Sequence, residues 1–169
     1  AVVITLSAVY AQLVMKFTTA QTITLILVVN ITAAIGAFVF GYVQDRLGHK
    51  KTLALTILLW IIMGVMAAFS HGPVSFWIAA NIAGIAMGSS QSAGRAVVAV
   101  FAPAGELAQF YSAWNVAVWG ANVLGPITYG TVTWLTSGDQ RTAILVTTLF
   151  FVIGLLILRR VHLPSKTVC

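Results

Sequence analysis

The stretch GYVQDRLGHKK, residues 41–51, joins two long apolar runs and carries an unusual share of the charge of this chain. Only 7% of the 169 residues are Asp, Glu, Lys or Arg, yet Asp45, Arg46, Lys50 and Lys51 all lie here. A charge cluster of this kind is costly to move through hydrocarbon. The stretch therefore predicts a connector held on one side of a membrane.

The composition of the whole chain agrees with a lipid environment. Hydrophobic residues make up 60% of it, and the mean hydropathy is +1.00. A soluble domain carries about 25% charged residues, and one with so few would expose large apolar patches. The net charge of +6 does not predict a nucleic-acid partner, because the basic residues lie at the ends of apolar runs. The lipid bilayer is the expected partner.

Six apolar segments are expected to be helices, because backbone groups cannot stay unpaired in hydrocarbon. They cover residues 1–15, 23–40, 53–69, 74–98, 110–135 and 143–158. The first would span about 22 Å, short of the hydrocarbon core of about 30 Å, so we interpret it as a truncated spanning helix. It has no charged n-region and does not resemble a signal peptide. The predicted fold is an all-α, polytopic transmembrane helical bundle.

The basic residues predict the orientation of this bundle. Six crossings leave Lys16 and Arg141 on one side of the membrane. The other side, which we expect to be cytoplasmic together with both ends of the chain, receives Arg46, Lys50, Lys51, Arg95, Arg159, Arg160 and Lys166. The predicted division is a transmembrane domain over residues 1–158 and a short basic cytoplasmic tail over residues 159–169.

The spacing G-x-x-x-D-R-x-G-H-K-K resembles the signature loop of the major facilitator superfamily. The positions that match are Gly41, Asp45, Arg46, Gly48, Lys50 and Lys51. In that family the loop connects the second and third helices of each six-helix half, as it does here, although His49 stands where Arg or Lys is usual. A plain loop that only sets orientation is the alternative.

This resemblance implies the C-terminal half of a twelve-helix fold, with the N-terminal half of the same chain as its partner. It also implies that Asp45 and Arg46 form a latch against helix ends of the opposite half.

Residues 83–130 resemble the vacuolar effluxer family of autophagy permeases and their bacterial relatives. The match rests on Gln91, Arg95, Pro103, Phe110, Tyr111, Asn115 and the Gly125-Pro126 block with Gly130. Trp119 and Gly120 stand where relatives often have a glycine and a basic residue. The resemblance implies a bacterial inner-membrane protein and favours efflux of an amino acid or similar metabolite.

Polar and small residues form a stripe on each of two consecutive segments, at about 100° per residue. The first stripe holds Asn81, Gly84, Gly88, Gln91, Ser92 and Arg95, and the second holds Ser112, Asn115, Trp119, Asn122 and Pro126. Polar side chains avoid lipid, so we expect both stripes to face protein or water. The candidate solute-cavity residues are Asn81, Gln91, Asn115, Trp119 and Asn122. Simple helix-to-helix contact is the alternative for each of them.

Three pairs of residues predict particular helix geometry or contacts. Gly84-x-x-x-Gly88 predicts close helix approach, and Gly125-Pro126 predicts a kink, either static or mobile. Arg95 and Glu106 are expected to pair at the cytoplasmic end.

All three carboxylates, Asp45, Glu106 and Asp139, lie in connectors, and no metal-ligand spacing or nucleophile–base pair is visible. We therefore expect no enzyme activity, cofactor or metal. The expected function is secondary-active or facilitative transport of a small polar solute by alternating access. A sensor or assembly scaffold that retains the permease fold without transporting is the alternative.

Overall fold

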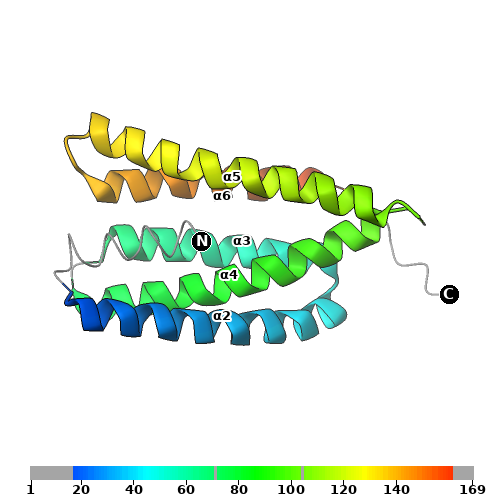
Figure 1. Cartoon of the computed structure of the whole chain (residues 1–169), viewed down its shortest axis with the longest axis horizontal. Coiled ribbons are helices and arrows are strands. Elements are labelled where there is room, and N and C mark those ends of the chain that lie inside the picture. The colour runs from blue at the N-terminus through cyan, green and yellow to red at the C-terminus, as the bar shows by residue number, and fades with distance from the viewer. Residues whose placement is uncertain (1–16, 71, 104, 162–169) are drawn as a thin grey trace.

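A computed structural model of the chain describes residues 17–70, 72–103 and 105–161. These ranges hold five helices and no strand, which confirms the all-helical prediction. The helices are α2 (Thr19–Leu47), α3 (His49–Ala68), α4 (Pro73–Phe101), α5 (Leu107–Leu135) and α6 (Gln140–Arg160) (Figure 1). They correspond to the last five predicted apolar segments, whereas the first segment lies outside the described residues.

Three of these helices, α2, α3 and α6, are long and apolar enough to cross a membrane by length and composition. Helices α4 and α5 have 29 residues each, but their Gly, Ser, Asn and Gln residues lower the hydropathy. The prediction of six spanning helices is therefore not confirmed for the described residues.

The predicted connector at residues 41–51 is far shorter than expected. Gly48 alone separates α2 from α3, and its φ of +83° lies in the region that favours glycine. Its N–H donates to the Gln44 carbonyl at 3.0 Å, which closes the last turn of α2. Asp45 and Arg46 thus belong to the end of α2, and Lys50 belongs to the start of α3. A single left-handed residue reverses the chain, so both helices extend into the motif.

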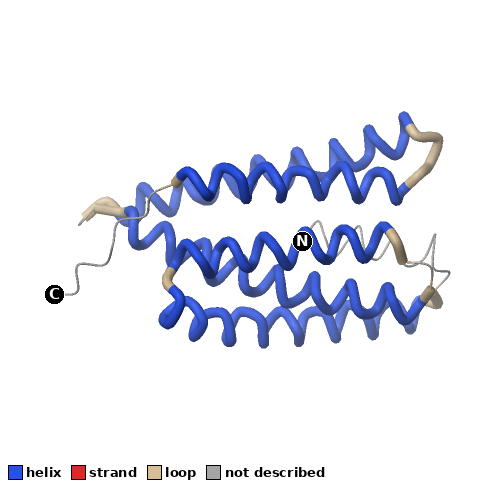
Figure 2. Tube along the Cα trace, turned by 180° about the vertical axis from the view of Figure 1, so that it is seen from behind, coloured by secondary structure: helices blue, strands red, loops and turns tan. Residues whose placement is uncertain are grey.

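The helices form two groups. Helix α2 packs along α4, which also packs on α3, while α5 packs on α6 (Figure 1). The groups meet mainly through α3 and α6, and the same division is visible from behind (Figure 2). At the start of α2, a buried cluster comprises Phe17, Leu25, Val29, Phe76 and Ala80.

Successive helices run in opposite directions, so the charged positions divide between the two ends of the bundle (Figure 1). Arg46, Lys50 and Lys51 lie at the end that also holds the last turn of α6, with Arg159 and Arg160 in that turn. Arg141 lies in the first turn of α6, at the opposite end.

Candidate functional site

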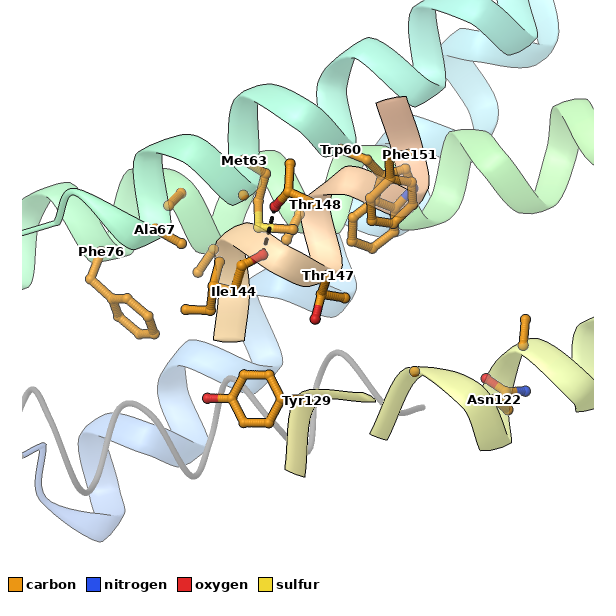
Figure 3. Close-up of a pocket in the computed structure, with 16 residues that line it drawn as sticks. Trp60, Met63, Ala67, Phe76, Asn122, Tyr129, Ile144, Thr147, Thr148 and Phe151 are labelled. Carbon is orange, nitrogen blue, oxygen red and sulfur yellow. Dashed lines mark hydrogen bonds between the residues drawn. The ribbon is translucent and has the colours of Figure 1, made fainter. Parts of the chain in front are cut away.

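A cavity of about 260 Å³ lies among α3, α4, α5 and α6 (Figure 3). Small and apolar side chains make up most of its wall. The lining residues are Trp60, Met63, Gly64, Ala67, Phe76, Ala79, Ala80, Ala83, Ala121, Asn122, Gly125, Tyr129, Ile144, Thr147, Thr148 and Phe151. Most of its polar groups come from α5 and α6. The α5–α6 group therefore forms the more polar side of the cavity, and the group of α2, α3 and α4 forms the more apolar side.

The polar groups of α6 are already paired. Thr147 and Thr148 donate through Oγ1 to the carbonyls of Ala143 and Ile144, each at 2.8 Å. Their outward surface is therefore methyl and hydroxyl oxygen, and a hydroxyl oxygen can still accept a hydrogen bond. This wall can contact a solute without leaving an unpaired donor.

Helix α5 contributes the more available polar edge. It runs unbroken through Pro126, which has no N–H to donate to the carbonyl four residues earlier. That carbonyl belongs to Asn122, whose side chain also lines the cavity. Asn122 therefore brings a side-chain amide to one wall, and its backbone carbonyl lacks the usual helical donor.

Two stacked aromatic rings, one from α3 and one from α6, form part of the cavity wall. The rings of Trp60 and Phe151 stack with centroids 5.1 Å apart and planes 3° apart. Trp60 Nε1 donates to Ser90 Oγ at 2.8 Å, which joins α3 to α4. The structure thus gives a role to Trp60, Thr147 and Thr148, which our stripe argument did not select. The sequence signal that could have identified them is one Trp and two consecutive Thr residues within otherwise apolar segments.

The polar stripe of α4 is divided by its contacts. Gly84 and Gly88 approach α2 so closely that a methyl group at Gly84 would lie 2.6 Å from the Val29 carbonyl oxygen, which confirms the predicted close approach. Asn81 donates through Nδ2 to the carbonyl of Trp77 in its own helix at 2.8 Å. Gln91 is exposed. The α4 stripe therefore contacts α2 at its two glycines and is exposed at Gln91.

The polar stripe of α5 is mostly exposed: Ser112, Asn115, Trp119 and Asn122 are all exposed, and Pro126 is partly buried. Of the five candidate solute-cavity residues, Asn122 lines the cavity described above. The structure does not bring Asn81, Gln91, Asn115 and Trp119 to the same cavity.

The end of α4 differs from the expectation for Arg95. Arg95 and Glu106 are both exposed, and over the described residues no ion pair joins them. The contact present is a hydrogen bond from the Tyr111 hydroxyl to the Arg95 carbonyl at 3.1 Å. A backbone contact therefore ties α5 to α4 here, and both charged side chains extend into solvent.

The signature motif has its own set of contacts. The Arg46 guanidinium lies 4.6 Å from the ring centroid of Tyr42 and donates to its hydroxyl at 2.5 Å. The buried Gln44 amide lies 2.5 Å from His49 Nδ1. Asp45 is exposed, with no hydrogen bond or ion pair to the described part of the chain. Arg46 is thus held along α2, while the Asp45 carboxylate is available to a partner.

At the opposite end, Asp139 caps α6. Its carboxylate accepts from the Thr142 hydroxyl and from the backbone N–H groups of Arg141 and Thr142. The hydrogen bond from the Thr142 hydroxyl has the largest effect on the Asp139 carboxyl and lowers its pKa below 3.8. Desolvation opposes this shift, and the backbone donors and the Arg141 charge add to it. Within the ranges that the structure describes, no three His, Cys, Asp or Glu side chains gather as metal ligands would.

Comparison with known proteins identifies relatives along nearly the whole chain. The family model described as "Vacuole effluxer Atg22 like" matches residues 1–168. An uncharacterized MFS-type transporter, YxiO of Bacillus subtilis, is 28% identical over 143 residues, which cover 85% of this chain and 33% of the relative. A putative metabolite transport protein of Haemophilus influenzae is 33% identical over 133 residues, covering 76% of this chain and 32% of the relative.

The fold also matches solved structures. The xylose transporter XylE from E. coli in an inward-open conformation superposes with a TM-score of 0.80 at 20% identity, over 96% of this chain and 44% of that one. The proton:xylose symporter XylE bound to 6-bromo-6-deoxy-D-glucose gives the same TM-score and identity over 41% of its length. The chain therefore spans about a third of its curated relatives and less than half of these structures.

Proposed function

The chain belongs to the family of vacuole effluxer Atg22-like proteins within the major facilitator superfamily, and on this premise we propose that it is the C-terminal half of a transporter. The whole protein moves a small polar solute across a membrane by alternating access between two six-helix halves. Transporter names among the relatives support this reading, as does the XylE fold.

The observation that carries the proposal is the exposed polar stripe of α5. Asn115 and Trp119 are uncovered in this half although they lie well inside a 29-residue helix, and Ser112 is uncovered nearer its start. Asn and Ser facing lipid are unfavourable. The stripe is therefore best suited to face the other half of the carrier and the solute pathway between the halves.

The proposed solute is an amino acid or a similar metabolite, and efflux is the proposed direction. Asn115 and Asn122 each offer both hydrogen-bond donors and an acceptor, and Trp119 offers a flat apolar surface. These groups suit an uncharged or zwitterionic polar molecule. The description of the family as vacuole effluxers supports the direction.

The decisive experiment is transport by the full-length protein in proteoliposomes, with labelled amino acids tested first and sugars second. Asn115→Ala is expected to lower the transport rate about tenfold, the effect of losing one or two solute hydrogen bonds. Asn81→Ala is the matched control, because Asn81 already bonds its own helix, and it should transport nearly normally. A purified, folded protein that moves none of these solutes would favour the sensor or scaffold alternative.

We further propose that Asp45 and Arg46 form a latch that stabilises one access state against the opposite half. The exposed, unbonded carboxylate of Asp45 supports this, because it can accept from a helix end of the partner half. Asp45→Asn in the full-length protein should lower transport about tenfold while membrane insertion stays normal. Normal transport by this variant would remove the proposed role.

The proposed location is a bacterial inner membrane, with the signature motif and both ends of the chain in the cytoplasm. The gathering of Arg46, Lys50, Lys51, Arg159 and Arg160 at one end of the bundle supports this orientation. Labelling of a Lys51→Cys variant from the outside of intact cells tests it: modification by a membrane-impermeant reagent would contradict the proposed orientation.

A further inference from the structure

Helices α3 and α6 form the seam between the two helix groups, and they are antiparallel. In the middle of the seam, Trp60 stacks on Phe151, and Gly64 lies directly against Thr148. A methyl group at Gly64 would meet Thr148 Cβ at 3.1 Å, so the two helices approach very closely here. The ends of the seam are joined differently, by charge.

At one end, a lysine of α3 caps α6. Lys50 Nζ donates to the Arg159 carbonyl at 3.0 Å and to the Val161 carbonyl at 2.7 Å. The last carbonyls of a helix have no intrahelical partner and carry partial negative charge. Lys50 therefore satisfies the C-terminus of a helix more than 100 residues away in sequence.

At the other end, an arginine of α6 bonds the C-terminal end of α3. The Arg141 guanidinium donates to the Ser70 carbonyl at 3.1 Å, just beyond the C-cap residue Phe69. The two contacts are reciprocal: Lys50 is the second residue of α3, and Arg141 is the second residue of α6. Each helix supplies the cation that bonds the end of the other.

The placement of these cations is unfavourable by local rules. A positive charge in the first turn of a helix opposes its macrodipole. The first turn of α3 has neither an acidic residue nor a side-chain cap, whereas at α6 the N-cap carboxylate of Asp139 offsets part of the cost for Arg141. The carbonyls of the antiparallel neighbour offset this cost, because its C-terminus lies beside the same turn. A cation that destabilises its own helix at this position thus stabilises the contact between the two antiparallel helices.

We propose that Lys50 and Arg141 form a reciprocal clamp that holds α3 and α6, and through them the two helix groups, as one body. The clamp gives Lys50 a role separate from membrane orientation and from the Asp45–Arg46 latch. It also ties the signature motif to the end of α6, so a displacement of the motif would carry α6 with it. This inference stands whether or not the protein transports.

Hydrogen exchange of the full-length protein in lipid nanodiscs tests the clamp, because each variant should act on the other helix. Lys50→Met is expected to speed exchange in the last turn of α6 about fivefold, and Arg141→Met is expected to do the same in the last turn of α3. Lys50→Arg should retain slow exchange. Lys51→Met is the matched control, since Lys51 is the exposed neighbour of the same charge, and it should leave α6 unchanged.

Unchanged exchange at the partner helix, or equal acceleration by Lys51→Met, would overturn the clamp. If Lys50→Met fails to insert, Lys50→Gln, which is too short to reach the carbonyls, supports the same comparison. Replacing both Lys50 and Arg141 by Met should also speed exchange around Gly64 and Thr148. Unchanged exchange there would overturn the claim that the clamp holds the two helix groups together.

Discussion

Helices α4 and α5 are alike in length and composition but unlike in packing. Each has 29 residues, with several glycines and an Asn-containing stripe. Ten residues of α4 are buried, including Gly84, Gly88 and Ser89, whereas no residue of α5 is. Similar sequence signals therefore have opposite structural outcomes in neighbouring helices.

The glycines show the cause of this difference. Gly84 and Gly88 of α4 allow contact with the backbone of α2, and Gly36 of α2 lies against α4 in the same way, since its added methyl would lie 2.6 Å from the Ile85 carbonyl. Gly120 and Gly130 of α5 have nothing within 4 Å of that position. A glycine in a helix interior is destabilising relative to alanine unless something requires it. Gly120 and Gly130 meet no such requirement within this half.

The largest expected effect comes from adding a methyl group to one glycine of each helix. Gly88→Ala would place Cβ against the Ala33 carbonyl and 3.0 Å from the Ala37 nitrogen, both backbone atoms that cannot turn aside. It is expected to destabilise the full-length protein by about 3 kcal/mol. Gly120→Ala meets open space and should stabilise it by about 0.5 kcal/mol.

The measurement is the free energy of unfolding in mild detergent, with expression level as a check on insertion. If Gly120→Ala were as costly as Gly88→Ala, α5 would be packed as tightly as α4 in the full-length protein. The difference in packing between α4 and α5 would then exist only in the isolated half.

A smaller effect is expected from replacing one Trp in each region. Trp60 is 8% exposed, stacks on Phe151 and bonds Ser90, whereas Trp119 of α5 is 74% exposed. Trp60→Phe should lower the free energy of unfolding by about 1 kcal/mol through loss of the Ser90 hydrogen bond. Trp119→Phe should leave the free energy of unfolding unchanged. Its readout is transport, where a changed apparent affinity would place Trp119 on the solute pathway, and unchanged transport would leave it as a surface residue.

The smallest expected effect concerns how α5 is held despite having no buried residue. It leads through a short turn into α6, whose first turn is capped by Asp139. Because the pKa of this carboxyl is lowered in the folded protein, its contribution is present above 3.8 and is lost as the pH falls through the lower folded pKa. The midpoint of thermal unfolding should therefore decline slightly more steeply with acid in the parent than in Asp139→Asn. Identical acid profiles would show that this cap contributes nothing to the α5–α6 unit.

Much of the fold could be predicted from local sequence. Apolar runs of sufficient length indicated five of the described helices, and turn-forming residues such as Gly72-Pro73 marked their ends. The Gly84-x-x-x-Gly88 spacing correctly indicated close helix contact. The boundaries around residues 41–51 were wrong, since charge suggested a loop where one glycine with positive φ is sufficient to join two helices.

The candidate site was less predictable. Helical periodicity identifies which residues share a face, but not what lies opposite that face. It therefore grouped Gly84, which contacts α2, with Gln91, which is exposed. It also omitted Trp60 and Thr147, which line a cavity among four helices.

The sequence by itself determined the lipid environment, the helical class and the family of this protein. These properties follow from composition, run length and local spacing, which need no knowledge of distant contacts. Only the tertiary structure decided which stripe is buried, where the cavity lies, and that Lys50 and Arg141 each bond the end of the other's helix. Those outcomes depend on which helices are neighbours, and residues more than 70 positions apart meet only when the bundle has formed.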